Sequence, residues 1–290
     1  MTVRIPDGLL VLETKADVKV WRQAQRAAGH TIGFVPTMGY LHEGHLSLIR
    51  MATERSEVVL ASIFVNPTQF APNEDLDAYP RDIEGDLRKA RSAGCAAVFL
   101  PSVSEMYSED AQTSIHAGAL AKGLCGESRP SHFSGVCTVV AKLLNIVGCD
   151  LAVFGQKDYQ QLAIIRRMVQ DLDIPVEILA GPIVRESDGL ALSSRNAYLS
   201  KEHRREALSL SEGLAQARSA WQKGERSAGT LRQAVADVIK TRPSAEIDYI
   251  QVVDAVSLEP IEVDCAGDAL IALAVRFGAT RLIDNTVLEV

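Results

Sequence analysis

Short apolar runs alternate with amphipathic stretches along about the first 180 residues of the chain. Runs typical of buried strands occupy residues 31–36, 58–65, 96–100, 150–154 and 176–180. Helical periodicity fills the segments between them, at about 45–55, 82–93, 134–147 and 158–171. Continuous apolar strands alternating with helices are typical of a parallel sheet covered on both faces, so this part predicts an α/β fold. Ligands of such sheets bind at the carboxyl ends of the strands.

The pattern changes after about residue 185. Two helical stretches, roughly 201–222 and 227–240, precede strand candidates at 247–254, 269–275 and 281–288. Helices followed by strands indicate a small α+β domain. The polar segment 182–190 contains Gly and Pro and resembles a hinge. The sequence therefore predicts a domain over residues 1–184 and a smaller one over 185–290.

Composition excludes several classes of protein. The 290 residues are 47% hydrophobic and 23% charged, as in ordinary globular proteins, and the formal charge of −7 does not favour nucleic acid. The sequence contains no run of about 18 apolar residues, the length that would predict a membrane span. Its N-terminal segment has acidic residues where a signal peptide has none. The five cysteines form no Cys-x-x-Cys pair, which argues against a disulfide framework or a zinc site. We expect a cytoplasmic protein.

The segment 36–45, PTMGYLHEGH, lies between a strand candidate and a helix candidate. Its glycines allow a turn close to a ligand, and the helix start offers unpaired backbone N–H groups. His42 and His45 there can donate to phosphate oxygens, the chemistry of adenylation. A single histidine near a turn is more often structural. A metalloprotease His-Glu-x-x-His motif is excluded, because residue 46 is Leu.

Further candidate groups follow other strands. Lys157, in the segment FGQKDYQQ, would lie in a first helical turn, where a cation is disfavoured, so we expect phosphate contact rather than a solvated lysine. Gln161 lies four residues on, on the same face. Asn66 and Gln69 could hold a carboxylate or hydroxyl, although Asn-Pro also starts ordinary turns.

The segment 192–196, LSSRN, places Arg195 and two hydroxyls near the domain boundary, where a loop could close over a triphosphate. A capped surface turn is an equally good interpretation of it. Among Asp82, Glu84 and Asp86, one carboxylate could bind Mg²⁺, although acidic residues are also favoured at helix starts. The sequence has neither a Gly-x-Gly nor a Gly-Lys pair, so ATP would need another kind of site.

Four blocks in order, PTMGYLHEGH, VNPTQF, FGQKDYQQL and GLALSSRNAYL, resemble the pantothenate synthetase (pantoate–β-alanine ligase) family. The resemblance extends over essentially the whole chain. The His-x-Gly-His element more widely resembles the signature of class I aminoacyl-tRNA synthetases and nucleotidyltransferases. The family resemblance implies a Rossmann-like N-terminal domain, a smaller C-terminal lid domain and a cytoplasmic homodimer.

The resemblance also implies the reaction and its residues. Pantoate attacks the α-phosphate of ATP to give pantoyl adenylate, and β-alanine then releases pantothenate and AMP. His42, His45, Lys157 and Arg195 would be catalytic, and Asn66, Gln69 and Gln161 would hold pantoate or β-alanine. The ATP site would comprise Met38, Gly39, Tyr40, Leu41, His42, Glu43, Gly44, His45, Gly155, Gln156, Lys157, Asp158, Val184, Leu192, Ser193, Ser194 and Arg195. Mg²⁺ is implied for the triphosphate, with Asp86 as the candidate ligand.

Two other functions fit parts of the pattern. A nucleotidyltransferase could use the same His-x-Gly-His element on another small substrate, without a second acceptor step. A non-catalytic nucleotide sensor could use the fold for binding alone. The paired glutamines, which suit a small hydroxy acid, argue against both.

Overall fold

The computed structural model describes residues 4–71, 74 and 76–290. The chain forms two compact units. The first comprises residues up to 117, 129–156 and 164–182, and the second comprises 118–128, 157–163 and 183–290. Two short segments that precede residue 182, namely 118–128 and 157–163, are therefore grouped with the C-terminal part of the chain.

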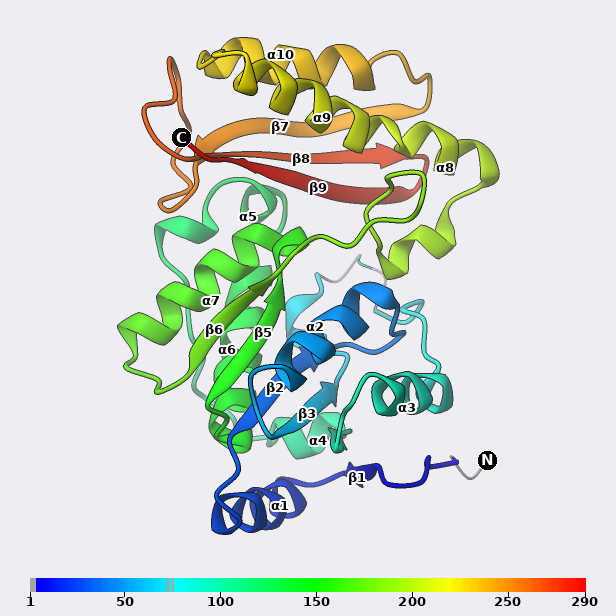
Figure 1. The fold of residues 1–290 in the computed structure, drawn as a ribbon, viewed down its shortest axis with the longest axis vertical. Helices are drawn as coiled ribbons and strands as arrows, with labels where there is room; N and C mark the ends of the chain where they lie inside the picture. Colours follow the sequence, from blue (N-terminus) through cyan, green and yellow to red (C-terminus); the bar gives the residue numbers. More distant parts are fainter. Residues whose placement is uncertain (1–3, 72–73, 75) are drawn as a thin grey trace. The chain divides into compact units, whose positions relative to one another are not determined.

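A six-stranded parallel sheet forms the centre of the first unit (Figure 1). Its strand order is β1-β4-β3-β2-β5-β6. The bounds are β1 Leu10–Leu12, β2 Ile32–Thr37, β3 Val58–Ile63, β4 Ala97–Phe99, β5 Leu151–Gly155 and β6 Glu177–Gly181. The central strands are buried along nearly their whole length, as expected for strands covered on both faces.

Helices cover this sheet. On one side, α2 (Glu43–Thr53) contacts β2, β3 and β5 and also packs against α3 (Ile83–Ser92). Helix α6 (His132–Val147) contacts β2 and packs against α1 (Lys15–Ala27). The remaining helices and 3₁₀ turns of this part of the chain are η1 Pro67–Gln69, α4 Val103–Met106 and η3 Gln156–Asp158, with α7 Tyr159–Asp171 running from one unit's residues into the other's.

Local sequence explains why these helices start where they do. Thr14 and Asp17 form a reciprocal capping box at α1, which satisfies two of the N–H groups that a helix start leaves unpaired. Asp82 accepts a hydrogen bond from the Gly85 N–H at 3.0 Å and caps α3. Gly148, with φ +58°, ends α6 in the left-handed conformation that glycine tolerates best.

The second unit is built on an antiparallel sheet of order β7-β8-β9. These strands span Ala245–Asp254, Ala269–Phe277 and Thr280–Leu288. Its other elements are η2 Ala119–Ala121, α5 Cys125–Ser128, η4 Ser194–Tyr198, α8 Lys201–Ala207, α9 Ser209–Gln222 and α10 Ala228–Ile239. Helices α9 and α10 pack on each other, and Leu214, Trp221, Leu231 and Val235 join strand residues such as Ile271 in one core.

The predicted α/β fold with a smaller α+β part is confirmed. The strand predictions at 31–36, 58–65, 96–100, 150–154 and 176–180 correspond to β2 to β6. β1 was not predicted, because a three-residue strand carries too little periodicity. Helix α1 was also not predicted, although its 13 residues are amphipathic. The stretch 201–222 is two helices, since the chain turns at Leu208 between α8 and α9.

Candidate active site

The corner between β2 and α2 has an unusual backbone. Gly39 and Tyr40 follow one another with φ +87° and +51°. Thr37 stabilises the start of the turn, because its hydroxyl accepts a hydrogen bond from the Gly39 N–H at 3.1 Å. Helix α2 then begins, with His42 in the N-cap position. The sequence 38–45 thus runs across the carboxyl end of β2, the edge at which parallel sheets bind ligands.

The side chains of His42 and His45 each accept a hydrogen bond from a backbone N–H group at the start of α2. The Nδ1 atom of His42 accepts a hydrogen bond from the Gly44 N–H at 3.2 Å, and Nδ1 of His45 accepts from the His42 N–H at 3.3 Å. The two ring centroids are 4.1 Å apart. Because an accepting Nδ1 carries no proton, each neutral ring carries its proton on Nε2. The corner therefore presents two oriented Nε2–H donors.

Glu43, in the first turn of α2, has an ordinary structural partner. Its carboxylate forms an ion pair with Arg50, two turns along the same helix. The hydrogen bond from Arg50 lowers the pKa of Glu43 from its usual range. Both side chains are about half exposed, so the pair adds little to stability.

Asp86 is fully buried on α3 and contacts the same corner. Its two carboxylate oxygens accept hydrogen bonds from the backbone N–H groups of Tyr40 and Leu41, each at 2.7 Å. Burial raises the pKa of Asp86, and these backbone hydrogen bonds oppose that shift. In the described part of the chain, no three His, Cys, Asp or Glu side chains gather into a metal site. The role of Asp86 as a metal ligand stays a prediction.

Met38, Asn66 and Gln69, three predicted site residues, meet in the first unit. The Gln69 side-chain amide donates to the Met38 sulfur at 2.9 Å and accepts from Asn66 Nδ2 at 3.2 Å. Asn66 is 1% exposed, and its amide also contacts the Gly135 carbonyl and the Tyr107 hydroxyl. Protein partners thus surround the Asn66 amide on both ends.

Two residues beside Gln69 were missed in the sequence. Arg129 Nη2 donates to the Gln69 carbonyl at 3.2 Å, and His132 Nδ1 lies 2.9 Å from the same oxygen. The Arg129 guanidinium also pairs with Glu74, with Nε 2.6 Å from Oε1. Arg129 lies in the polar run that precedes the apolar helix α6, and His132 is the first residue of that helix. This polar stretch was the only signal in the sequence.

Lys157, Asp158 and Gln161 belong to the second unit, whereas Gly155, the last residue of β5, and Gln156, the first residue of η3, belong to the first. The Lys157 ammonium lies 4.0 Å from the Asp158 carboxylate, and its backbone carbonyl accepts from Asn285 at 2.8 Å. Gln161 is half-buried.

Gln160, the neighbour of Gln161, has a structural role in the second unit. Its side chain donates to the carbonyls of Leu120 and Gly123, each at 2.8 Å, and accepts from the Cys125 N–H at 3.0 Å. These three hydrogen bonds fix the segment 118–128 to the start of α7.

A tight loop brings Val184 beside the LSSRN segment. The Leu192 N–H donates to the Val184 carbonyl at 3.0 Å, and the backbones of Arg185 and Ala191 pair in an isolated antiparallel β-bridge. Arg185 also forms a two-point ion pair with the buried Asp284, at 2.6 and 2.9 Å. The Ser193 hydroxyl caps η4 by accepting from the Arg195 N–H at 3.3 Å, with Ser194 as the first residue of η4.

The predicted residues are thus divided between the two units. The first contains residues 38–45, Asn66, Gln69, Asp86, Gly155 and Gln156, and the second contains Lys157, Asp158, Gln161, Val184 and Leu192 to Arg195. Contacts join residues 38–45 to Gln69 and Asp86 in the first unit and Val184 to Leu192 in the second.

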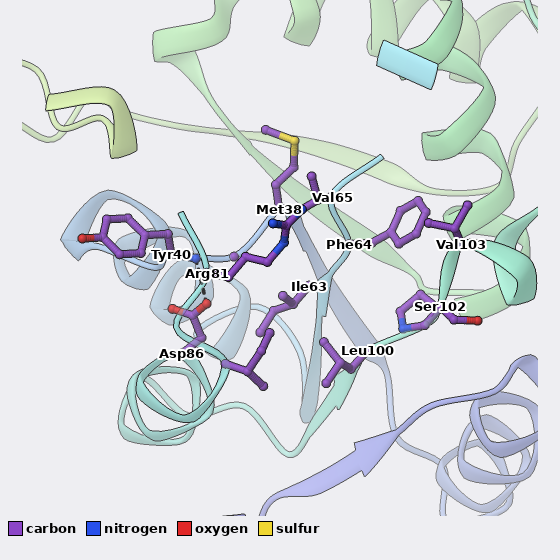
Figure 2. Close-up of a pocket in the computed structure, with 13 residues that line it drawn as sticks. Met38, Tyr40, Ile63, Phe64, Val65, Arg81, Asp86, Leu100, Ser102 and Val103 are labelled. Carbon is purple, nitrogen blue, oxygen red and sulfur yellow. Dashed lines mark hydrogen bonds between the residues drawn. The ribbon is translucent and has the colours of Figure 1, made fainter. Parts of the chain in front are cut away.

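A pocket of about 240 Å³ lies beside the corner in the first unit (Figure 2). Its walls are mostly apolar and come from the carboxyl ends of β3 and β4 and from the start of α3, with Arg81 and Ser102 as polar groups. Met38, Gly39, Tyr40 and Asp86 line it, whereas the two histidines do not.

Comparison with known proteins identifies the family. The Pantoate-beta-alanine ligase profile matches residues 10–287. A pantothenate synthetase of Acetivibrio thermocellus is 52% identical over 97% of this chain and 99% of its own length. A pantothenate synthetase of Moorella thermoacetica is 55% identical over the same shares.

Solved structures agree with the sequence comparison. Pantothenate synthetase from Thermus thermophilus superimposes with a TM-score of 0.91 at 42% identity, covering 97% of this chain and 100% of that one. Pantoate-beta-alanine ligase from Francisella tularensis, complexed with beta-gamma ATP and beta-alanine, has a TM-score of 0.80 at 34% identity, covering 97% and 98%. The chain therefore belongs to the pantoate–β-alanine ligase family.

Proposed function

We propose that this enzyme condenses pantoate with β-alanine at the expense of ATP. A pantoate carboxylate oxygen attacks the α-phosphorus, and the bond to the bridging oxygen breaks, releasing pyrophosphate. The β-alanine amine then attacks the acyl carbon of pantoyl adenylate, and AMP leaves as pantothenate forms. Family membership over residues 10–287 supports this reaction.

The observation that carries the proposal is the fixed pair of imidazoles at the start of α2. Their Nδ1 atoms accept backbone hydrogen bonds, so the Nε2–H groups are the ring donors that can face a phosphate oxygen. Charge develops on the bridging and terminal phosphate oxygens as pyrophosphate leaves. Donors aimed at those oxygens stabilise the transition state.

The remaining roles extend this proposal. Residues 38–45, Gly155 to Asp158, Val184 and Leu192 to Arg195 would bind ATP, with Lys157 and Arg195 on the phosphates. Gln69 and Gln161, with Asn66, would hold pantoate or β-alanine. The division at 184/185 would separate an ATP- and pantoate-binding domain from a lid. A lid suits the chemistry, since an acyl adenylate hydrolyses readily when water reaches it.

Magnesium fits this site as part of the Mg·ATP substrate rather than as a metal held by the protein. Both Asp86 oxygens accept backbone N–H bonds. The described residues bring together no cluster of three potential metal ligands. Mg²⁺ often takes only one or two ligands from a protein and the rest from substrate phosphates and water, so a bound triphosphate would supply what the residues do not.

We further propose a homodimer in the cytoplasm. The five cysteines are free, which suits a reducing compartment. Each helix that the structure describes is too short or too polar to cross a lipid bilayer. Sedimentation at micromolar concentration tests the dimer: a monomer mass would refute it.

One assay separates the proposed reaction from its alternatives. Pyrophosphate release from ATP should require pantoate, and AMP release should require β-alanine as well. Pyrophosphate release that needs pantoate but never yields AMP would indicate a nucleotidyltransferase. ATP binding without release of either product would indicate a sensor.

A further inference from the structure

Two side chains of helix α3 bind the backbone of the corner between β2 and α2, which carries His42 and His45. One accepts hydrogen bonds from backbone N–H groups of the corner, and the other donates to a backbone carbonyl. Asp86 accepts from the Tyr40 and Leu41 N–H groups, each at 2.7 Å, and Figure 2 shows this carboxylate directed at Tyr40. One helical turn along α3, the Lys89 ammonium donates to the Leu41 carbonyl at 2.8 Å. The same ammonium lies 5.9 Å from the centre of the Tyr40 ring. Leu41 is therefore fixed at its N–H and at its C=O.

The backbone held in this way is strained. Tyr40 has φ +51°, a left-handed conformation that L-residues other than Asn and Asp rarely adopt, because the Cβ comes too close to the carbonyl oxygen. Its neighbour Gly39 leaves little room for a side chain, since a Cβ there would lie 3.0 Å from Asp86 Oδ2 and 3.0 Å from Ile63. The carboxylate therefore fits against the turn itself, and its two hydrogen bonds compensate for the strain at Tyr40.

The helix start alone does not explain a carboxylate at position 86. Glu84, in the same first turn, already supplies an exposed acidic side chain near the amino end of α3, and Asp82 supplies the cap. Asp86 is instead fully buried, a costly place for a carboxylate unless hydrogen bonds satisfy it. Its partners are the corner's N–H groups, so the corner is the feature that this residue serves.

The Asp86–Lys89 clamp on Leu41 lies next to the reactive groups in the chain. Leu41 directly precedes His42, whose N–H fixes the ring of His45. A shift of Leu41 would move the His42 N–H and turn both imidazoles. Donors that act on a transferring phosphate are sensitive to such shifts, because misplacement by about 1 Å can cost about 100-fold in rate.

We propose that Asp86, assisted by Lys89, is a positioning residue that sets the orientation of His42 and His45 for adenylation. This inference rests on the proposed function of the two histidines. It assigns the Asp86 carboxylate to the protein backbone instead of to magnesium.

The test uses Asp86→Asn, Lys89→Met and the matched control Glu84→Gln, which removes a carboxylate from the same helical turn. Asparagine keeps one acceptor oxygen but turns an N–H donor toward a backbone N–H. We expect Asp86→Asn to lower kcat for pantoate-dependent pyrophosphate release by about 10–100-fold, with an ATP KM within about threefold of wild type. Lys89→Met should show a smaller loss of the same kind. Glu84→Gln should match wild type.

A second readout needs no substrate. Hydrogen exchange in peptides covering residues 38–45 should be faster in Asp86→Asn, with the rest of the first unit unchanged. If Asp86→Asn does not fold, Lys89→Met gives the same comparison. A protein that releases no pantoate-dependent pyrophosphate would refute the proposed function, while the exchange result would still test the clamp.

Three results would overturn the inference. A folded Asp86→Asn variant with normal kcat would show that the clamp does not serve catalysis. Loss of kcat with unchanged exchange over residues 38–45 would show that Asp86 acts in another way. A higher Mg²⁺ concentration for half-maximal rate in Asp86→Asn would assign the carboxylate to the metal. The expected result is an unchanged Mg²⁺ dependence.

Discussion

At the scale of single residues, the hydrogen bonds of a side chain separate a group that can serve a ligand from one that supports the fold. His42 and His45 each accept a backbone hydrogen bond at Nδ1, so the proton of each neutral ring lies on Nε2. Asn66 and Gln160 instead use their amides to join segments of the protein. Residue type alone does not make this distinction, because each amide and imidazole has several ways to be satisfied.

The histidine pair gives the first prediction. His45→Ala should lower the rate of pyrophosphate release by about 10²-fold or more, as expected for the loss of one aimed donor. His42→Ala should destabilise the protein more than His45→Ala does, because it also removes the N-cap of α2. Initial rates of pyrophosphate release measure the effect on catalysis, and thermal melting curves measure the effect on stability. His30→Ala, at the opposite end of β2, is the control, and a folded His45→Ala enzyme with a near-normal rate would refute the role.

The two glutamines give the second prediction. Gln69→Ala and Gln161→Ala should each raise the pantoate KM by about tenfold or more, with a smaller change in the ATP KM, because polar partners in the pantoate site would be left unpaired. Initial-rate measurements over both substrates test this. Gln160→Ala is the contrast, since it removes three internal hydrogen bonds and should lower the melting temperature instead. Equal rises for both substrates would contradict the assignment.

At the scale of elements, η1 and α6 approach closely enough to make Gly135 necessary. A Cβ at this position would lie 2.4 Å from the Thr68 carbonyl oxygen and 2.8 Å from the Gln69 Cα. The Asn66 amide then donates to the Gly135 carbonyl at 3.3 Å, and Arg129 and His132 contact the Gln69 carbonyl. Contacts from the start of α6 and from the residues just before it thereby fix the position of the Gln69 backbone. The residue type at position 69 does not determine that position.

The ion pair beside η1 gives the third prediction. Burial raises the pKa of Glu74, but the Arg129 guanidinium outweighs it and holds that pKa below the ordinary value of 4.5. A carboxyl with a lowered folded-state pKa stabilises the protein above its unfolded pKa, and this stabilisation is lost as pH falls through the folded value. Glu74→Gln should therefore cost on the order of 1–2 kcal/mol of unfolding free energy at pH 7.

Urea unfolding from pH 3 to pH 8 measures this effect. The difference between wild type and Glu74→Gln should be constant above about pH 5 and should shrink below the ordinary carboxyl pKa. Glu84→Gln, at an exposed position, is the control for loss of one carboxylate. A difference that grows as pH falls would contradict the prediction.

At the scale of the whole molecule, the proposed catalytic residues come from both compact units. His42 and His45 belong to the first, and Lys157 and Arg195 to the second. Within the second, the segment 183–192 is anchored at its start by Arg185 on Asp284, and Arg204 ties down Glu186 and Asp188. Asn196 of η4 is joined to the same segment, because its side-chain amide donates to Glu186 and to the Ala191 carbonyl.

The LSSRN segment gives the fourth prediction. Saturating Mg·ATP should slow hydrogen exchange at residues 192–199 more than at 185–190, because the LSSRN segment is the part proposed to close over the triphosphate, whereas 185–190 is already held by ion pairs. Arg195→Lys should recover part of the activity lost in Arg195→Ala, since it keeps the charge but loses the planar fork. Unchanged exchange together with full activity in Arg195→Ala would show that the segment is structural.

Strand and helix periodicity in the sequence was sufficient to predict most elements. The central strands β2, β3 and β5 are apolar runs because both of their faces are buried, and that burial leaves a continuous signal. β1 is three residues long and its partner β4 lies more than eighty positions away, so its pairing depends on a contact that local pattern does not contain. The sequence analysis treated α8 and α9 as one helix, because the apolar periodicity continues across Leu208.

The sequence by itself determined the α/β order of the first part, the helices and strands of the last, and the short segments that carry histidine, lysine, arginine and glutamine. These features are local, because period and turn residues act over a few positions. Only the tertiary structure decided that Asp86 fits under the corner, that Arg129 and His132 support Gln69, and that 118–128 joins the C-terminal part. Each depends on which distant backbone group comes within hydrogen-bonding distance, and packing alone sets that distance.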